Sequence, residues 1–207
     1  MNANGKFPIE IAKKKALEIA QALEPHCERL KVAGSIRRGK LWVKDIDLVA
    51  IPRMYSKNAL FGRTSELDKT DFYEAVRGVL SSLTSEGMKL LRGPAYLDYP
   101  TTIPVDIYIA ADESWATLLL IRTGSLEHNI WMCARAKACG GKLHADGSGL
   151  EVPGQYDPVA QRVINNKVIR AKTEEEIFKA MGIPLADPKD RECANGRPVW
   201  MARGATA

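Results

Sequence analysis

The feature that most limits how this sequence can fold is a change of pattern near residue 111. Before this point, helical and extended apolar segments follow one another in the order helix, strand, strand, helix, strand, strand. After it, the chain has mainly helical patterns with short extended segments. We therefore expect an α+β protein with two domains. Residues 1–110 would form a mixed sheet backed by helices, and residues 111–207 a smaller, mainly helical domain with a short sheet.

The apolar periodicity places individual elements. Apolar residues recur with helical spacing from Ile9 to Leu23, and Pro25 ends the run. In the first domain we expect further elements at residues 30–33 (strand), 46–51 (strand), 71–83 (helix) and 88–109 (two or three strands), with a polar surface loop at 53–70. In the second we expect them at 113–121, 127–139 and 173–181 (helices), and around 142–152 and 163–169 (extended).

Composition excludes several classes of protein. With 207 residues, 45% of them hydrophobic, the chain can bury a core, which argues against a disordered protein. Its apolar runs fall far short of the ~20 residues that span a bilayer, and the N-terminus has no apolar signal region. Its four cysteines lack zinc-finger spacing, so free thiols are expected. These features predict a cytoplasmic protein without membrane association.

Positive charge is concentrated at the start of the chain. Residues 1–44 contain ten Lys or Arg against four Glu, whereas the remainder is nearly neutral. Such a basic segment can bind phosphates, but a solvated helix face would show the same charge pattern. Charge alone leaves both interpretations open.

Two carboxylates lie at the entrance to the second apolar strand. Asp45 and Asp47 are two residues apart, so in a strand they point to the same face. At about 4 Å and an effective dielectric near 20, they repel by roughly 4 kcal/mol, which favours a cation between them. Hard divalent cations such as Mg²⁺ accept this oxygen ligation. Two surface acids on an edge strand would, however, look the same.

Two further features favour a metal and a phosphate at this place. Gly34-Ser35 follows a strand and precedes Arg37 and Arg38, a pattern that offers amides, a hydroxyl and guanidinium groups to phosphates. Asp106 lies within another apolar strand, where an unpaired acid is costly to bury. If the strands of Asp47 and Asp106 are neighbours, three carboxylates converge. That is the layout of two-metal phosphoryl or nucleotidyl transfer.

Longer motifs carry a family resemblance. The first half contains Gly34-Ser35-Ile36-Arg37-Arg38-Gly39, followed by Asp45-Ile46-Asp47-Leu48. The second half contains Thr123-Gly124-Ser125, His128-Asn129-Ile130, Glu174-Glu175-Glu176-Ile177-Phe178 and Met181-Gly182-Ile183-Pro184. Over residues 8–193 the chain resembles the family X DNA polymerases, which are DNA polymerase beta-like nucleotidyltransferases. It is similar to short forms made of a palm and a C-terminal subdomain, so we expect no lyase activity on 5′-deoxyribose phosphate.

The resemblance implies a role for each matching residue. Asp45 and Asp47 would bind two metal ions, and Asp106 would bind the catalytic one and help to activate the primer 3′-hydroxyl. The residues implied in nucleotide binding are Gly34, Ser35, Arg38, Lys44, Ile121, Arg122, Thr123, Gly124 and Asn129. It further implies Mg²⁺ as cofactor, with Mn²⁺ able to substitute, dNTP as substrate, primer-template or gapped DNA as partner, and a monomer that fills short gaps in repair.

Some positions depart from the family pattern. Ile121 and Arg122 replace an aromatic pair that packs on the sugar, which leads to the hypothesis of relaxed selectivity against ribonucleotides. Cys133 stands where the family has an arginine, and this weakens the expectation of high fidelity. Two alternatives stay open: a template-independent or ribonucleotide-tolerant nucleotidyltransferase, and a non-catalytic DNA-binding protein.

Overall fold

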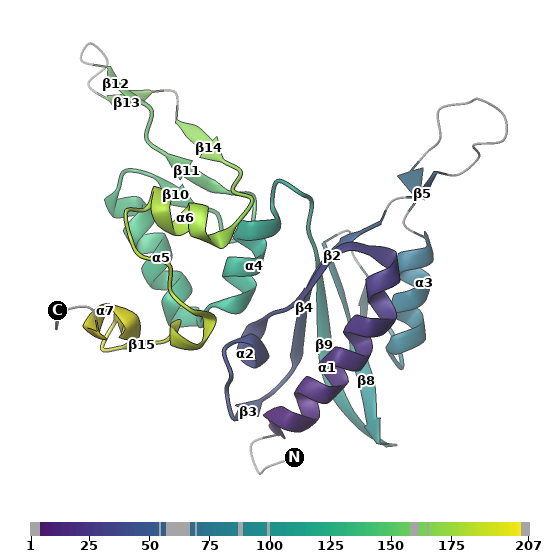
Figure 1. Cartoon of the computed structure of the whole chain (residues 1–207). Coiled ribbons are helices and arrows are strands. Elements are labelled where there is room, and N and C mark those ends of the chain that lie inside the picture. Colours follow the sequence, from purple (N-terminus) through teal and green to yellow (C-terminus); the bar gives the residue numbers. More distant parts are fainter. Residues whose placement is uncertain are drawn as a thin grey trace. The chain divides into compact units, whose positions relative to one another are not determined.

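The computed structural model of the chain, shown in Figure 1, divides into two compact units. The first comprises Met1–Ile36 with Lys40–Ala110, and the second Arg37–Gly39 with Ala111–Ala207. The structure describes residues 5–53, 55–56, 67–68, 70–86, 89–98, 100–157, 162–164 and 166–203. Most of the expected loop at 53–70 lies outside these residues. The two units are described separately below.

A five-stranded mixed sheet forms the centre of the first unit. Its strand order is β2 (Cys27–Val32), β4 (Ile46–Pro52), β9 (Thr101–Ile109), β8 (Leu90–Asp98) and β7 (Ser85–Glu86). In this sheet, as far as it is described, β4 and β9 are parallel and the other neighbours are antiparallel. The two strands β8 and β9, which form a long hairpin, agree with the two or three strands expected within 88–109. The parallel pairing sets the two strands that carry Asp47 and Asp106 side by side.

Two helices cover the sheet and close the core. Helix α1 (Ile9–Leu23) contacts α3 (Thr70–Val79), and both contribute buried side chains to the apolar cluster that contains the sheet residues (Figure 1). Leu23 of α1 and Phe72 of α3 are fully buried. Burial of each such side chain stabilises the fold by about 1.5–3 kcal/mol. The apolar stripe predicted for residues 9–23 is thus the face that packs inward.

Shorter elements complete the first unit. They are β1 (Phe7–Pro8), paired with β3 (Trp42–Val43); the 3₁₀ turn η1 (Glu24–His26); the single helical turn α2 (Gly34–Arg37); and β5 (Tyr55–Ser56), paired with β6 (Leu67–Asp68). The turn α2 follows β2 directly, as expected for a strand that passes into a helix or tight loop. Helix α3 ends at Val79 rather than at residue 83, because the chain turns at Leu80 and Ser81 donates its amide to Pro94 on β8.

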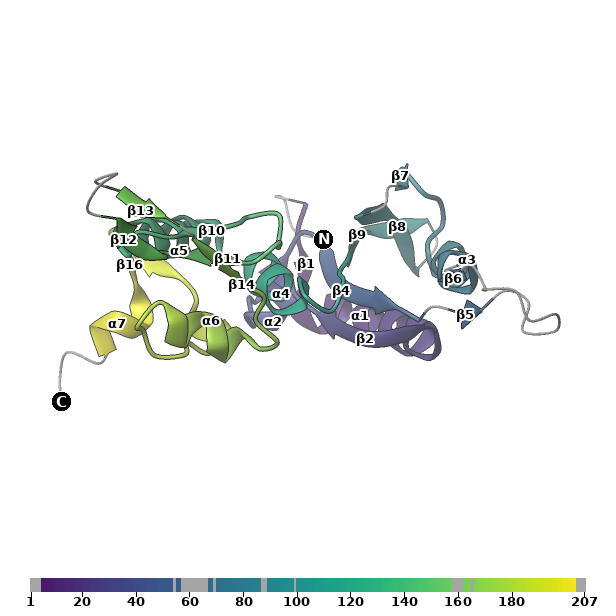
Figure 2. The ribbon, with the colours of Figure 1, turned by 90° about the horizontal axis from the view of Figure 1, so that it is seen from above.

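The second unit is built from helices and a small sheet. Its main helices are α4 (Trp115–Thr123), α5 (Leu126–Ala138), α6 (Glu174–Ala180) and α7 (Val199–Arg203). The antiparallel sheet consists of β10 (Lys142–Leu143), β11 (Leu150–Val152) and β14 (Lys167–Ile169), and Figure 2 shows it beside α5. Other elements are the hairpins β12 (Gln155–Asp157) with β13 (Arg162–Ile164) and β15 (Cys193–Ala194) with β16 (Arg197–Pro198), and the turn η3 (Pro188–Asp190).

Helix ends in this unit follow from capping. Ser125 accepts a hydrogen bond from the His128 amide at the start of α5, and Thr173 accepts one from the Glu176 amide at the start of α6. Side-chain caps of this kind stabilise a helix by about 1 kcal/mol each.

The two units together confirm the expected α+β class, with a mixed sheet backed by helices and a mainly helical second part. No helix in the described residues is long and apolar enough to cross a membrane.

Candidate active site

Three carboxylates lie at one end of the β4–β9 strand pair. Asp47 in β4 is directly opposite Asp106 in β9, flanked by the pairs Ile46–Val105 and Leu48–Ile107. Asp45 immediately precedes β4. The pairing satisfies the condition on which the expected convergence of the three acids depended, namely that the two strands are neighbours.

Burial and mutual repulsion shape the electrostatics of these acids. Burial raises the pKa of Asp45, and the nearby charge of Asp106 raises it further, whereas Lys44 and Arg92 oppose the shift. Among the described residues, however, no group of three or more His, Cys, Asp and Glu side chains is arranged to hold a metal ion. The acids are thus close enough to influence one another without forming a ready-made cluster. The assignment of Asp45, Asp47 and Asp106 as metal ligands stays a prediction.

The glycine turn approaches Asp47 closely. Gly34 has φ +58°, and a Cβ placed on it would overlap the Asp47 carboxylate. The backbone is tied here as well, since the Ala33 amide donates to the Asp47 carbonyl at 2.8 Å. Only glycine fits a left-handed backbone pressed against a side chain in this way. The Asp47 carboxylate therefore rests against the turn that bears Ser35.

Ser35, the residue that follows Gly34, has an unused hydroxyl. Its Oγ is buried and has no hydrogen-bond partner in the described part of the chain. A buried polar atom without a partner costs free energy, so the position is suited to an oxygen-rich ligand that would engage the hydroxyl. Lys44 is exposed, and its charge acts on Asp45.

Asp106 is held by two residues that sequence patterns did not single out. Arg92 in β8 donates from Nε to Oδ1 at 2.5 Å and from Nη2 to Oδ2 at 2.6 Å, and the Tyr108 hydroxyl donates to Oδ2 at 3.1 Å. Arg92 lies opposite Asp106 in the β8–β9 hairpin. The Asp98–Thr101 pairing continued without a shift would put Asp106 opposite Gly93, but the register shift between Tyr96 and Asp98 puts Arg92 there instead, so the sequence carries no local signal for this partner. The bidentate ion pair explains how a carboxylate is tolerated inside an apolar strand.

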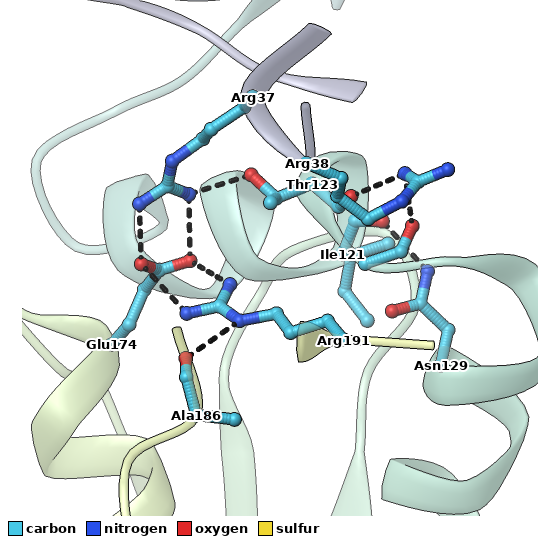
Figure 3. A network of polar contacts seen from close by, with 9 residues as sticks. Arg37, Arg38, Ile121, Thr123, Asn129, Glu174, Ala186 and Arg191 are labelled. Atoms are coloured by element: carbon cyan, nitrogen blue, oxygen red, sulfur yellow. Dashed lines mark hydrogen bonds and ion pairs between the residues drawn. The ribbon is translucent and has the colours of Figure 1, made fainter. Parts of the chain in front are cut away.

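A second polar network lies in the second unit, centred on Glu174 of α6 (Figure 3). Arg37 donates to both carboxylate oxygens at 2.9 and 2.7 Å and to the Thr123 hydroxyl at 2.6 Å. Arg191, which is 1% exposed, donates to the same carboxylate at 2.6 and 3.2 Å and to the Ala186 carbonyl. Burial raises the pKa of Glu174, but the hydrogen bonds from the two guanidinium groups outweigh it, so the pKa is lowered.

Arg38 also has protein partners in this network. Its Nε donates to Glu192 at 2.8 Å, and its Nη1 donates to the carbonyls of Thr123 and Gly124 at 2.6 and 3.0 Å. Figure 3 shows Arg38 beside Thr123. These bonds fix the corner at which α4 ends and the chain turns into α5. Three of the predicted nucleotide-binding residues, Arg38, Thr123 and Gly124, therefore meet directly.

Asn129 and Ile121 meet at the same corner. The Asn129 Nδ2 donates to the Ile121 carbonyl at 2.7 Å, whereas the buried Oδ1 finds no partner among the residues described. A Cβ on Gly124 would lie only 2.5 Å from that oxygen, so a larger residue there would have to displace the Asn129 side chain. The Ile121 side chain is 7% exposed and packs inward, whereas Arg122 is partly exposed. The predicted nucleotide-binding roles of these residues stay predictions.

The fold and the arrangement of these residues define a class. A mixed sheet backed by helices, with acids on neighbouring parallel strands and a glycine turn between β2 and β4, followed by a mainly helical, thumb-like region, is an α+β fold. Comparison with known proteins narrows the class.

A family model described as DNA polymerase beta thumb matches residues 118–192. The chain is 26% identical over 193 residues to the protein named DNA polymerase/3′-5′ exonuclease PolX of Bacillus subtilis (strain 168), an alignment that covers 90% of this chain and 29% of that protein. The chain is thus similar to a family X polymerase, which confirms the resemblance drawn from its motifs. It spans less than a third of the length of the relative it matches.

Proposed function

We propose that this chain is a metal-dependent nucleotidyltransferase that adds deoxynucleotides to a DNA primer under the direction of a template, filling short gaps in repair. One observation carries the proposal: Asp47 and Asp106 are opposite each other on parallel strands, beside a glycine turn whose Ser35 hydroxyl is buried and unpartnered in the described structure. The likeness to family X DNA polymerases supports the same reaction.

The residues present fit divalent cations. All three acids offer hard oxygen ligands, and the pKa of Asp45 is raised first by burial and then by the charge of Asp106, which a bound cation would offset. Asp45 and Asp47 would hold two Mg²⁺ ions, with Mn²⁺ able to substitute, and Asp106 would hold the one nearer the primer. When bound, the ions would lower the pKa of the primer 3′-hydroxyl and stabilise the triphosphate charge.

Other side chains would bind and orient the nucleotide. The Ser35 hydroxyl would donate to a phosphate oxygen, with Gly34 leaving room for the backbone to approach and Lys44 adding positive charge. Arg38 would exchange part of its bonding to Glu192 for a phosphate, since guanidinium groups bind both partners in the same bidentate manner. Thr123 and Gly124 would contact the sugar, and the unpartnered Asn129 Oδ1 offers an acceptor toward a base edge.

Primer extension tests the proposal directly. We expect the wild type to extend a primer across a one-nucleotide gap with the complementary dNTP in Mg²⁺. Asp106→Ala should lower the rate on the order of 10³-fold, because several kcal/mol of charge stabilisation is lost. Glu74→Ala, which removes an exposed acid of α3, is the matched control and should retain activity. Unchanged extension by Asp106→Ala, with its fold intact, would contradict the proposed mechanism.

The same assay separates the alternatives. Ile121 and Arg122 in place of an aromatic pair favour a ribonucleotide-tolerant or template-independent enzyme as the second candidate. Extension with each rNTP, and of a primer without template, would favour that candidate. A wild type that binds DNA but is inert with both Mg²⁺ and Mn²⁺ would instead favour a non-catalytic DNA-binding protein.

A further inference from the structure

Asp106 is bound by a cationic side chain on the neighbouring strand. Arg92 reaches it across the β8–β9 hairpin, and its Nε and Nη2 each donate to a different oxygen of the carboxylate. Tyr108 donates to the second of these oxygens. Both oxygens through which Asp106 could bind a cation are therefore already in charge-assisted hydrogen bonds.

The two partners of this ion pair differ in exposure. The Arg92 side chain is 51% exposed, whereas that of Asp106 is 9% exposed. If the pair separates, the guanidinium can remain hydrated, but the carboxylate is left buried without a counter-charge. Arg92 can therefore leave Asp106 at a small cost in free energy only when another cation replaces it at the carboxylate.

We propose that Arg92 competes with a divalent cation for Asp106, so that Arg92 sets how readily metal binds at the β4–β9 carboxylates. This inference rests on the proposed function, because it takes Asp106 to be a metal ligand. Without metal, Arg92 offsets the charge of Asp106 next to Asp45 and Asp47. When a cation binds Asp106, Arg92 gives up at least one of its two hydrogen bonds and turns toward solvent. Arg92 is a positioning residue in this scheme, since it acts on the site through Asp106.

Mn²⁺ binding to the full chain, without DNA or nucleotide, measures this competition. Free Mn²⁺ is followed by electron paramagnetic resonance during a titration. Arg92→Gln should lower the Mn²⁺ dissociation constant about tenfold, which corresponds to about 1.4 kcal/mol. Arg92→Lys should give a smaller decrease, because an ammonium group cannot form two parallel hydrogen bonds with a carboxylate. It also serves as the test if Arg92→Gln does not fold, as judged by circular dichroism.

A charge control and a coupling control complete the design. Arg77→Gln removes an exposed arginine of α3 and should leave the dissociation constant near that of the wild type. In an Asp106→Asn background, Arg92→Gln should no longer tighten Mn²⁺ binding, because the shared carboxylate is gone.

The outcomes distinguish this inference from the proposed function. If Arg92→Gln and Arg92→Lys bind Mn²⁺ as tightly as the wild type or more weakly, the proposed competition between Arg92 and the cation is wrong. If Mn²⁺ binding is nevertheless lost in Asp106→Asn, the proposed role of Asp106 stands. Absence of Mn²⁺ binding by the wild type and every variant would overturn both.

Discussion

At the residue scale, the site depends on close approaches that leave no room for a side chain. Gly34 combines a left-handed backbone with direct apposition to the Asp47 carboxylate. Gly39, five residues later, has a similar φ of +71°, but a Cβ there would meet nothing within 4 Å in the described structure. A side chain at Gly39 would introduce backbone strain alone, whereas a side chain at Gly34 would introduce both backbone strain and steric overlap with Asp47.

Alanine at each position tests that separation. Gly39→Ala should lower the free energy of unfolding by about 1 kcal/mol, the cost of a left-handed alanine. Gly34→Ala should cost at least about 1 kcal/mol more and displace the Asp47 carboxylate, so primer extension should also fall. Urea denaturation and extension rates measure both effects. Equal stability and activity of the two variants would show that the contact with Asp47 is unimportant.

At the element scale, Glu174 fixes the first turn of α6 by pairing with two arginines. One of them, Arg191, is fully buried and also stacks over the Phe178 ring, 5.4 Å from its centroid. A buried guanidinium that loses its carboxylate leaves an uncompensated charge in the interior. The network is thus a stronger determinant of stability than an exposed ion pair would be.

Glu174→Gln should destabilise the protein by about 3–5 kcal/mol, because it removes the counter-charge of Arg191. Glu175→Gln, in the same helical turn but exposed, should change stability by less than about 0.5 kcal/mol. Thermal denaturation of both variants at pH 7 provides the comparison. Similar melting temperatures would mean that Arg191 finds another partner.

At the scale of the whole molecule, two units share one chain, and buried His128 makes its stability depend on pH. His128 is 0% exposed, and neither ring nitrogen has a partner among the described residues. Burial lowers its pKa to about 4 from an ordinary value of 6.5, with the charges of Arg191 and Arg38 contributing in the same direction. The native protein thus keeps this imidazole neutral where the unfolded chain would protonate it.

Stability should therefore fall as pH decreases from about 6.5 to 4. Below pH 6.5 the unfolded state binds a proton at His128 that the native state does not bind. The resulting decrease in the free energy of unfolding reaches about 3 kcal/mol near pH 4. Urea denaturation at a series of pH values measures the slope. His128→Gln should flatten the curve in this window. A curve with the same slope in the variant would assign the pH dependence to other groups.

Features that depend on neighbouring residues could be predicted from the amino-acid sequence. Apolar periodicity placed α1 and the strands of Asp47 and Asp106, and the helix expected at 173–181 corresponds to α6, because these are local preferences. The glycine turn, the two aspartates of β4 and the longer motifs were enough to indicate the family.

Contacts between residues far apart in sequence could be known only from the folded chain. The parallel pairing of β4 with β9, the partnership of Arg92 with Asp106 and the network around Glu174 join residues far apart in sequence. The register of the β8–β9 hairpin, which shifts between Tyr96 and Asp98, chooses the partner of Asp106, and no local pattern contains that shift. The register of strand pairing is set by which face of the sheet is buried. The residues that contact the carboxylates can therefore be identified only from the folded structure.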